Sequence, residues 1–415
     1  MTQFTPVWNV ELNGVPITDS VLASMSITSG RTNIYEQAAA GFCNLTLINL
    51  NQTAITATVN DSISIELKNS SNVFIPIFGG TLTDIVVEVA EVGGVGYTQR
   101  VTMTALGALS RLPKLLTDGV LISENDGDQI YDVLRDVLFL RWNAVPAALQ
   151  WQSVDPTLTW ATAFNTGLGT IDQPGDYLLA ARSSSRTDSY SLVSALATSG
   201  FGYIWENESG QICYSDSTAR SQYLVANGYV ELSANNAQGS GLAIKTSAGD
   251  VRNSVTIQYD ATSSSEVSAE DLTSIATYGT LAQIVTTTLQ NIADATYQAN
   301  FYLSLRANPT PAFTNITYQL TNSEIDNADR NNLIDVFMGM PVSISDLPLN
   351  MSSGNFLGFV EGWTFQAAYN EIAISLNMSP LAYSLQASTW ASVSVLEQWN
   401  TITPTLQWQD AIVVV

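Results

Sequence analysis

Short runs of alternating apolar and polar residues dominate the first 110 positions of the chain. Cys43, Leu45 and Leu47 alternate with polar neighbours, and so do the apolar residues of segment 63–67. Such period-two patterns predict half-buried β-strands. Asn13-Gly14 lies between two further strand-like segments and is a favoured pair for a two-residue hairpin turn. Close strands without intervening helical patterns predict a β-barrel or sandwich over residues 1–110.

A helical period begins after residue 120. Apolar residues recur at helical spacing from Ile130 to Leu138, behind the acidic start Asp126-Gly127-Asp128. An acidic start suits a helix N-terminus, so a helix is predicted here. Glu124, Asp126 and Asp128 could alternatively bind calcium, although the loop glycine falls at the wrong place for an EF-hand.

A second helix is predicted over residues 189–199. Asp188 is the expected N-cap and Gly200 the expected end of this helix. A hairpin is predicted next, with its turn at 207–210. These features together predict a mixed α+β domain over residues 111–222.

Strand patterns return from about residue 225. We expect a strand over Asn253–Asp260, a Ser- and Glu-rich surface loop over Ser263–Glu270, and one helix over about 292–306. Asn308-Pro309 should end that helix. A second β domain is therefore predicted over residues 223–383, with further strands at 312–320, 341–346, 356–367 and 370–378.

Two stretches of the chain repeat one another. Ser62-Ile63-Ser64-Ile65 resembles Pro341-Val342-Ser343-Ile344, and a glycine follows sixteen residues after Ile63 and after Val342. Each copy continues into a closing strand. The repetition predicts two β-barrels of one type on either side of the α+β domain. Chance similarity between generic strand patterns is the alternative explanation.

Tryptophans recur every nine residues in two tracts, at 142–160 within the α+β domain and in an expected C-terminal arm, 384–415. Such regular indoles are expected to pack against one another or against a partner; a sugar-binding aromatic platform is the alternative. The final apolar residues could add as a strand to a neighbouring chain's sheet. The candidate interface and packing residues are Trp142, Trp151, Trp160, Trp390, Trp399, Trp408, Ile412, Val413 and Val414.

Composition limits the chemistry that this chain can perform. It has 415 residues with no histidine, so Ser-His-Asp and Cys-His catalysis is excluded. Cys43 and Cys213 cannot supply a zinc site by themselves and are expected to be free thiols. We expect no enzymatic activity, no metal and no cofactor. A pair of carboxylates, which can hydrolyse glycosides without histidine, is the remaining enzymatic alternative.

The charge and the apolar runs exclude further classes. There are 37 acidic and 14 basic residues, for a net charge of −23, which argues against wrapping nucleic acid. The apolar runs are too short for a membrane helix, and the first residues lack the features of a signal peptide. Gly93-Gly94-Val95-Gly96 precedes a strand, so a hairpin loop is expected there instead of a phosphate cradle.

Several motifs resemble one protein family. The first β domain carries Ile77–Ile85 before Val101–Gly107, and the second carries Gly339–Val342 and Gly358–Trp363. The middle domain carries Leu192–Gly200, Gly202–Trp205, Gly210–Ile212 and Arg220. In this order the motifs resemble the hub, or minor tail, proteins at the tip of long-tailed bacteriophages. The chain is thus expected to be mainly β, with two tail-tube-like β-barrels flanking a mixed α+β domain and an extended Trp-rich C-terminal tail.

This resemblance implies a structural function. Hub proteins of this kind commonly form homotrimers, in which two barrels per chain give six barrels that match a hexameric tube. The implied hub anchors neighbouring tail proteins, such as the distal tail ring, the tape measure and tip or fibre proteins. It surrounds the channel through which DNA leaves without specific binding. The implied location is the virion tail, after synthesis in the host cytoplasm, with no membrane contact.

The acidic composition agrees with a conduit for DNA, because carboxylates repel phosphates. We therefore expect the acidic excess on the inner face of such a ring. No lysozyme-like or peptidase insert is recognisable in the chain. The alternative functions are a distal-tail ring or other baseplate protein, and a glycan-binding or cell-surface module.

Overall fold

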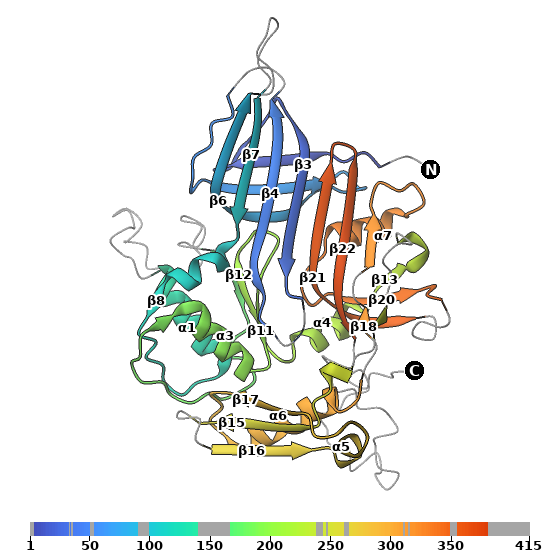
Figure 1. Cartoon of the computed structure of the whole chain (residues 1–415). Coiled ribbons are helices and arrows are strands. Elements are labelled where there is room, and N and C mark those ends of the chain that lie inside the picture. Colours follow the sequence, from blue (N-terminus) through green and yellow to red (C-terminus); the bar gives the residue numbers. More distant parts are fainter. Residues whose placement is uncertain are drawn as a thin grey trace, which may run out of the picture.

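The computed structural model of the chain is mainly β, as the sequence predicts (Figure 1). No helix among the described residues is both long and apolar enough to cross a membrane. The structure describes residues 4–32, 34, 36–49, 54–89, 99–139, 167–237, 244–245, 248–260, 265–309, 312–313, 316–348 and 355–380.

A single large sheet contains most of the strands. Its N-terminal part comprises β1 (Trp8–Leu12), β2 (Val15–Pro16), β3 (Ser20–Gly30), β4 (Ala39–Asn49), β5 (Ser62–Lys68), β6 (Phe74–Val89) and β7 (Gln99–Leu106). Its C-terminal part comprises β13 (Val230–Ser233), β19 (Ile316–Gln319), β20 (Pro341–Ser345), β21 (Phe356–Ala368) and β22 (Glu371–Pro380). The strand order is β13-β20-β21-β3-β4-β7-β6-β5-β1-β2, with β22 joined to β21 and β19 joined to β22.

Strand β21 connects the two parts of this sheet. Its first half pairs with β20, and its second half, Gly362–Ala368, pairs with Ser24–Gly30 of β3. The strand has 13 residues, so its second half extends beyond β20 and offers a free edge to β3. The sequence predicts two separate barrels, whereas the strands of both parts belong to one continuous sheet, and the order of its described strands does not close into a ring.

The predicted repeat corresponds to the same strand order in both copies. β5-β6-β7 and β20-β21-β22 are each three consecutive antiparallel strands. Ile63 lies opposite Gly80, and Val342 lies opposite Gly358. The two copies therefore share their topology, with pairing registers that differ by one residue.

The middle of the chain alternates helices with short strands. Two predicted helices are confirmed, and the backbone N–H of Ser191 donates to the Asp188 carboxylate at 2.8 Å, as expected for an N-cap. The predicted hairpin is confirmed as β11 and β12. The elements of this region are η1 (Ala108–Lys114), β8 (Leu116–Thr117), α1 (Asp126–Phe139), β9 (Leu168–Ile171), β10 (Thr187–Asp188), α3 (Ser189–Ser199), β11 (Tyr203–Glu206), β12 (Ile212–Ser215) and α4 (Ala219–Asn227).

A small sheet lies apart from the large one, at the lower end of Figure 1. Its order is β16-β15-β17, and the predicted helix α6 packs against β15 and β16. The remaining elements are η3 (Ala234–Asn236), β14 (Ile244–Lys245), η4 (Ala248–Asp250), β15 (Ser254–Tyr259), β16 (Ser265–Glu270), α5 (Leu272–Tyr278), β17 (Ala282–Thr286), α6 (Ile292–Arg306), β18 (Ala312–Phe313) and α7 (Asn327–Ile334).

Some local predictions are wrong. The segment predicted as a surface loop contains β16, because Val267 and Ala269 pair with the buried residues Ile257 and Val255 of β15. Three short helices, α4, α5 and α7, are present where the sequence pattern predicted none. The carboxylates of Asp271 and Asp326 accept hydrogen bonds from backbone N–H groups in the first turns of α5 and α7. These N-cap residues were the sequence signal from which both helices could have been predicted.

Candidate functional site

Three distant parts of the chain meet at one buried carboxylate, that of Glu361. Glu361 lies on β21, where the register with β22 shifts between Val360 and Gly362. An irregularity of this kind redirects a side chain. Arg31 follows the end of β3, and Arg220 is the second residue of α4. We call Arg31, Arg220, Glu361 and Ser379 the junction.

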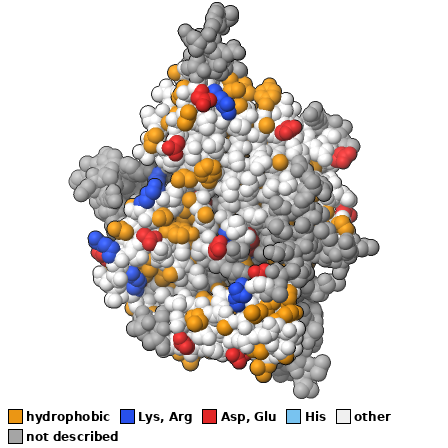
Figure 2. All heavy atoms as spheres, viewed as in Figure 1, with side chains coloured by type: hydrophobic (Ala, Val, Ile, Leu, Met, Phe, Trp, Pro, Cys, Tyr) orange, Lys and Arg blue, Asp and Glu red, His pale blue; other side chains and the backbone are white. Residues whose placement is uncertain are grey.

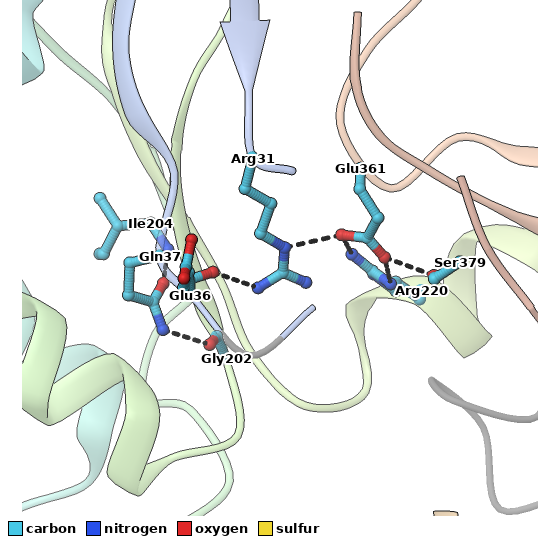
Figure 3. Close-up of polar contacts among 8 residues, drawn as sticks. All are labelled: Arg31, Glu36, Gln37, Gly202, Ile204, Arg220, Glu361 and Ser379. Atoms are coloured by element: carbon cyan, nitrogen blue, oxygen red, sulfur yellow. Dashed lines mark hydrogen bonds and ion pairs between the residues drawn. The ribbon is translucent and has the colours of Figure 1, made fainter. Parts of the chain in front are cut away.

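Both oxygens of the Glu361 carboxylate are fully engaged (Figure 3). Arg31 Nε donates to Oε2 at 2.7 Å, and Arg220 donates from Nη1 to Oε1 at 2.7 Å and from Nη2 to Oε2 at 2.9 Å. The hydroxyl of Ser379, on β22, donates to Oε1 at 2.5 Å. The bidentate pair with Arg220 fixes the angle between α4 and β21. A carboxylate saturated in this way holds structure together and is not available as a general base.

The charges of the junction stabilise one another. Burial alone would raise the pKa of Glu361, but Arg220 and Arg31 lower that pKa to about 2. Burial works against the charged form of Arg220, and Glu361 overcomes it, so the pKa of Arg220 is raised. The pKa of Arg31 is lowered, chiefly by burial. The guanidinium carbon of Arg220 lies 4.7 Å from the centre of the Tyr203 ring, which adds a cation–π contact.

A second buried carboxylate, that of Glu206, fastens the β11–β12 hairpin to the large sheet. Its two oxygens accept from the backbone N–H of Gly41 at 2.6 Å and of Leu109 at 2.5 Å. Among the described residues, no positively charged side chain offsets the burial of this carboxyl. Burial raises its pKa to about 7, although the two backbone hydrogen bonds lower it. Glu206 thus ties the middle region to β4 and η1.

The tip of the same hairpin packs directly on β6. A Cβ on Gly79 would overlap the carbonyl of Ser209, and a Cβ on Gly210 would overlap the carbonyl of Gly79. The N–H of Ala108 donates to the Gly210 carbonyl at 3.2 Å. Only glycine permits this approach, and Gly210 also has a φ of +72°.

Asp126 is buried at the start of α1. The Tyr214 hydroxyl donates to Oδ2, and the backbone N–H of Tyr177 donates to Oδ1 at 2.9 Å. Burial raises the pKa of Asp126 to about 6. These bonds give Asp126 a structural position instead of one in the alternative calcium site. The described residues contain no group of three or more His, Cys, Asp or Glu side chains placed to hold a metal ion.

The residues that the sequence analysis selected as interface candidates lie outside the described residues. These are Trp142, Trp151, Trp160, Trp390, Trp399, Trp408, Ile412, Val413 and Val414, and the glycine cluster at 93–96 also lies outside them. The thiols of Cys43 and Cys213 are described; both are free, as predicted, and both are buried.

The chemistry of the junction residues was not predicted from the sequence. One sequence feature could have indicated this site. Glu361 is the single charged residue within the largely apolar segment Phe356–Phe365, in a chain with only 12% charged residues. Which arginines it meets could not be read from the sequence. Arg31 and Glu361 are 330 positions apart, and the β3–β21 pairing brings them together.

The fold of the chain is that of phage tail proteins. The crystal structure of a 43 kDa tail protein of prophage MuSo2 from Shewanella oneidensis is similar, with a TM-score of 0.51 and 11% identity, over 90% of this chain and 100% of that one. The tail protein from Neisseria meningitidis MC58 is similar with a TM-score of 0.57 and 11% identity, over 92% of this chain and 98% of that one. No protein-family model matches the chain, and no curated protein matches it.

Proposed function

We propose that the chain is a structural subunit of a bacteriophage tail tip, where it forms a hub ring that continues the tail tube. The observation that carries the proposal is the likeness in fold to two phage tail proteins over nine-tenths of this chain. The likeness spans nearly the whole of those two proteins as well, so it involves the arrangement of all parts and not one shared sheet.

In this proposal three copies form the ring. Residues 1–110 and 223–383 are the two tube-like units of each chain, and residues 111–222 form the α+β unit between them. Three copies then present six tube-like units, which adapts a trimer to a hexameric tube. The shared order of β5-β6-β7 and β20-β21-β22 supports two units of one kind.

The junction gives this role a physical basis. A subunit of such a ring has to keep its two β units in a fixed orientation relative to each other. The β3–β21 pairing and the Arg31–Glu361–Arg220 network hold both units and α4 together. No enzymatic step is proposed; the buried carboxylate of Glu361 is saturated by arginine and serine donors.

The partners in this proposal are other copies of the chain and the neighbouring tail proteins, namely the distal tail ring, the tape measure and tip or fibre proteins. The location is the virion tail. The Trp tracts and the apolar end of the 384–415 arm are proposed to bind these neighbours, because tryptophan is enriched among the residues that contribute most of the binding energy of interfaces.

Two measurements test the proposal. Mass photometry of the purified chain should show a trimer; a hexamer would instead favour a distal-tail ring protein. Gold-labelled antibody against the chain should mark the tail tip of intact particles, and particles without label would contradict the tail function.

Variants of the arm distinguish binding to neighbouring tail proteins from binding to a receptor. Trp399→Ala and Trp408→Ala should prevent particle assembly if the arm grips tail proteins. Normal particles that fail only in adsorption would instead support a glycan-binding or cell-surface module. Trp205→Phe, which changes a tryptophan outside both tracts, is the matched control.

A further inference from the structure

A surface of the middle region combines positive charge with exposed apolar side chains. The segment that contains β8 runs antiparallel to the segment that ends in β10, with Leu121 opposite Arg182. We call residues 111–122 and 181–188 the basic ribbon. Its local charge is +2 in a chain of net charge −23, because four basic residues stand against two acidic ones, namely Arg111, Lys114, Arg182 and Arg186 against Asp118 and Asp188.

The cations of the basic ribbon are available to a partner. Arg111 and Lys114 are exposed, and the Lys114 ammonium forms no ion pair within the described part of the chain. Arg182 donates to backbone carbonyls, at 2.9 Å to that of Asp118, and these contacts leave its charge unneutralised. Arg186 pairs with the Asp118 carboxylate at 3.1 Å in an exposed ion pair.

Apolar side chains lie among these charges. Leu116, Val120 and Ile122 are 64%, 67% and 64% exposed. Leu121 is buried, so its neighbours on both sides point outward. Figure 2 shows basic and hydrophobic side chains together on the left of the molecule, where Figure 1 places η1 and β8. Exposed apolar groups that gather beside polar ones are typical of an interaction surface.

The small sheet offers a surface of the opposite charge. Helix α6 packs against one side of it, where Val255 and Ile257 of β15 are buried. We call its other side, the outward side of β15, β16 and β17, the acidic face. Glu266 and Glu270 of β16 are exposed there, and Ile284 of β17 is 64% exposed. The outward positions of these three described strands contain no basic residue.

Neutral side chains position the two carboxylates of the acidic face without neutralising them. Gln258 donates to Glu266 Oε1 at 2.8 Å, and the Ser254 hydroxyl donates to Glu270 Oε1 at 3.1 Å. Neither carboxylate forms an ion pair with a described residue. The acidic face thus presents two negative charges and an exposed isoleucine, whereas the basic ribbon presents positive charges and exposed aliphatic side chains.

We infer that the basic ribbon of one copy binds the acidic face of the next copy around the ring. This inference rests on the proposed function, for which it names the contacting surfaces. Complementary charges orient partners and exclude like-charged ones, so the basic ribbon is not suited to bind a second basic ribbon. A contact between two different surfaces is heterologous, and heterologous contacts generate rings where a two-fold dimer needs one self-complementary surface.

A protein partner explains the basic ribbon better than a nucleic acid does. Phosphates are bound through lysine and arginine, and this binding makes no use of apolar side chains. Leu116, Val120 and Ile122 are exposed among the cations, and Ile284 is exposed near the carboxylates of the acidic face. Burial of these side chains against each other would favour association, because removing apolar surface from water is favourable.

Reversal of charge on each surface tests the inference. The ribbon variant carries Arg111→Glu and Lys114→Glu, and the face variant carries Glu266→Lys and Glu270→Lys. Mass photometry over a series of concentrations gives the concentration at which half of the chains are in trimers. Each variant should raise this concentration by about tenfold or more, because like charges then meet. Thermal unfolding shows whether each purified variant folds.

The chain with all four substitutions is the decisive variant. Its charges are again opposite across the contact, so it should recover the wild-type trimer. Arg100→Glu and Glu371→Lys are the controls, because they reverse exposed charges on β7 and β22, away from both surfaces. They should leave the wild-type concentration unchanged. Added salt should weaken the wild-type trimer, since ions screen exposed charges.

Three outcomes would overturn the inference and leave the trimer standing. They are unchanged trimers of the ribbon and face variants, no recovery in the chain with all four substitutions, and equal losses in the controls. Duplex DNA binding that the ribbon variant abolishes while its trimer is unchanged would assign the basic ribbon to phosphates instead. A wild-type chain that forms no trimer would refute the proposed ring, and this inference with it. If a double variant does not fold, Lys114→Glu and Glu266→Lys alone carry the test.

Discussion

Arg31 Nε donates to Glu361 Oε2 at 2.7 Å, and this contact joins the end of β3 to β21 across 330 positions of the sequence. Replacing Glu361 by Gln leaves two buried guanidinium groups without their anion. Removing one partner of a buried ion pair typically costs about 3–5 kcal/mol of unfolding free energy. Urea unfolding followed by circular dichroism measures the loss.

Asp118→Asn is the control for this variant. It removes the anion of the surface pair Arg186–Asp118, whose side chains are 70% and 55% exposed. Exposed pairs contribute about 0–1 kcal/mol. Equal effects of the two substitutions would show that the junction does not stabilise the fold.

Acid should weaken the junction. The folded-state pKa of Glu361 is lowered to about 2, below its ordinary value of 4.5. The stabilisation is therefore complete above pH 4.5 and is lost as the pH falls towards 2. The difference in unfolding free energy between wild type and Glu361→Gln should shrink over this window, and a constant difference would contradict the assignment.

The contribution of Glu206 to stability should depend on pH in the opposite direction, falling as the pH rises. Burial raises its folded-state pKa to about 7, above the ordinary 4.5, so the folded chain retains a proton that the unfolded chain has released. Its contribution to stability is then highest below pH 4.5 and falls as the pH rises through 7, by about 3 kcal/mol in total.

Thermal or urea unfolding of wild type and Glu206→Gln between pH 4.5 and 8 isolates this group. The stability of wild type relative to Glu206→Gln should decline with rising pH. A relative stability that stays level, or that rises, would show that the Glu206 carboxyl is not held in a buried, cation-free site.

Gly210→Ala should be far more disruptive than Gly228→Ala. Both glycines have a φ of +72°, so both substitutions incur a backbone penalty of about 1–3 kcal/mol. A Cβ at Gly210 also meets the backbone of Gly79, whereas nothing lies within 4 Å of a Cβ at Gly228. The melting temperatures of the two variants test the contact between hairpin and sheet, and similar shifts would argue against it.

Tyr214→Phe should destabilise the chain mainly above pH 6. The lost hydroxyl lowers the pKa of the buried Asp126, which is about 6 in the folded chain, so its removal raises that pKa further. The variant should lose about 1–3 kcal/mol where Asp126 is ionised and less where it is protonated. Tyr369→Phe, at a 65% exposed ring, is the control for unfolding measurements at pH 4.5 and 7.5.

Local patterns predicted the elements with strong short-range signals. Helix α3 begins and ends where Asp188 and Gly200 indicate, and Asn13-Gly14 joins β1 to β2. The β16 strand was missed because its small and acidic residues gain their strand geometry from pairing with β15. Short-range patterns determine such elements only when the residues themselves favour the conformation.

The contacts of the junction could not be predicted from the sequence, because they depend on pairing between strands that are far apart in the chain. The fusion of the two β units depends on the pairing of β21 with β3, and no local pattern reports which edges meet. The junction follows from that pairing, because it places Arg31 beside Glu361. The tryptophan tracts, at 142–160 and in the 384–415 arm, remain a prediction, since they lie outside the described residues.

The most direct measurement of the proposed function is a cryo-electron microscopy reconstruction of the particle's tail tip, with this chain fitted to the density. The account predicts three copies around the tail axis, with six β units in register with the tube. A reconstruction that places the chain away from the axis, or that contains no density for it, would contradict the central claim.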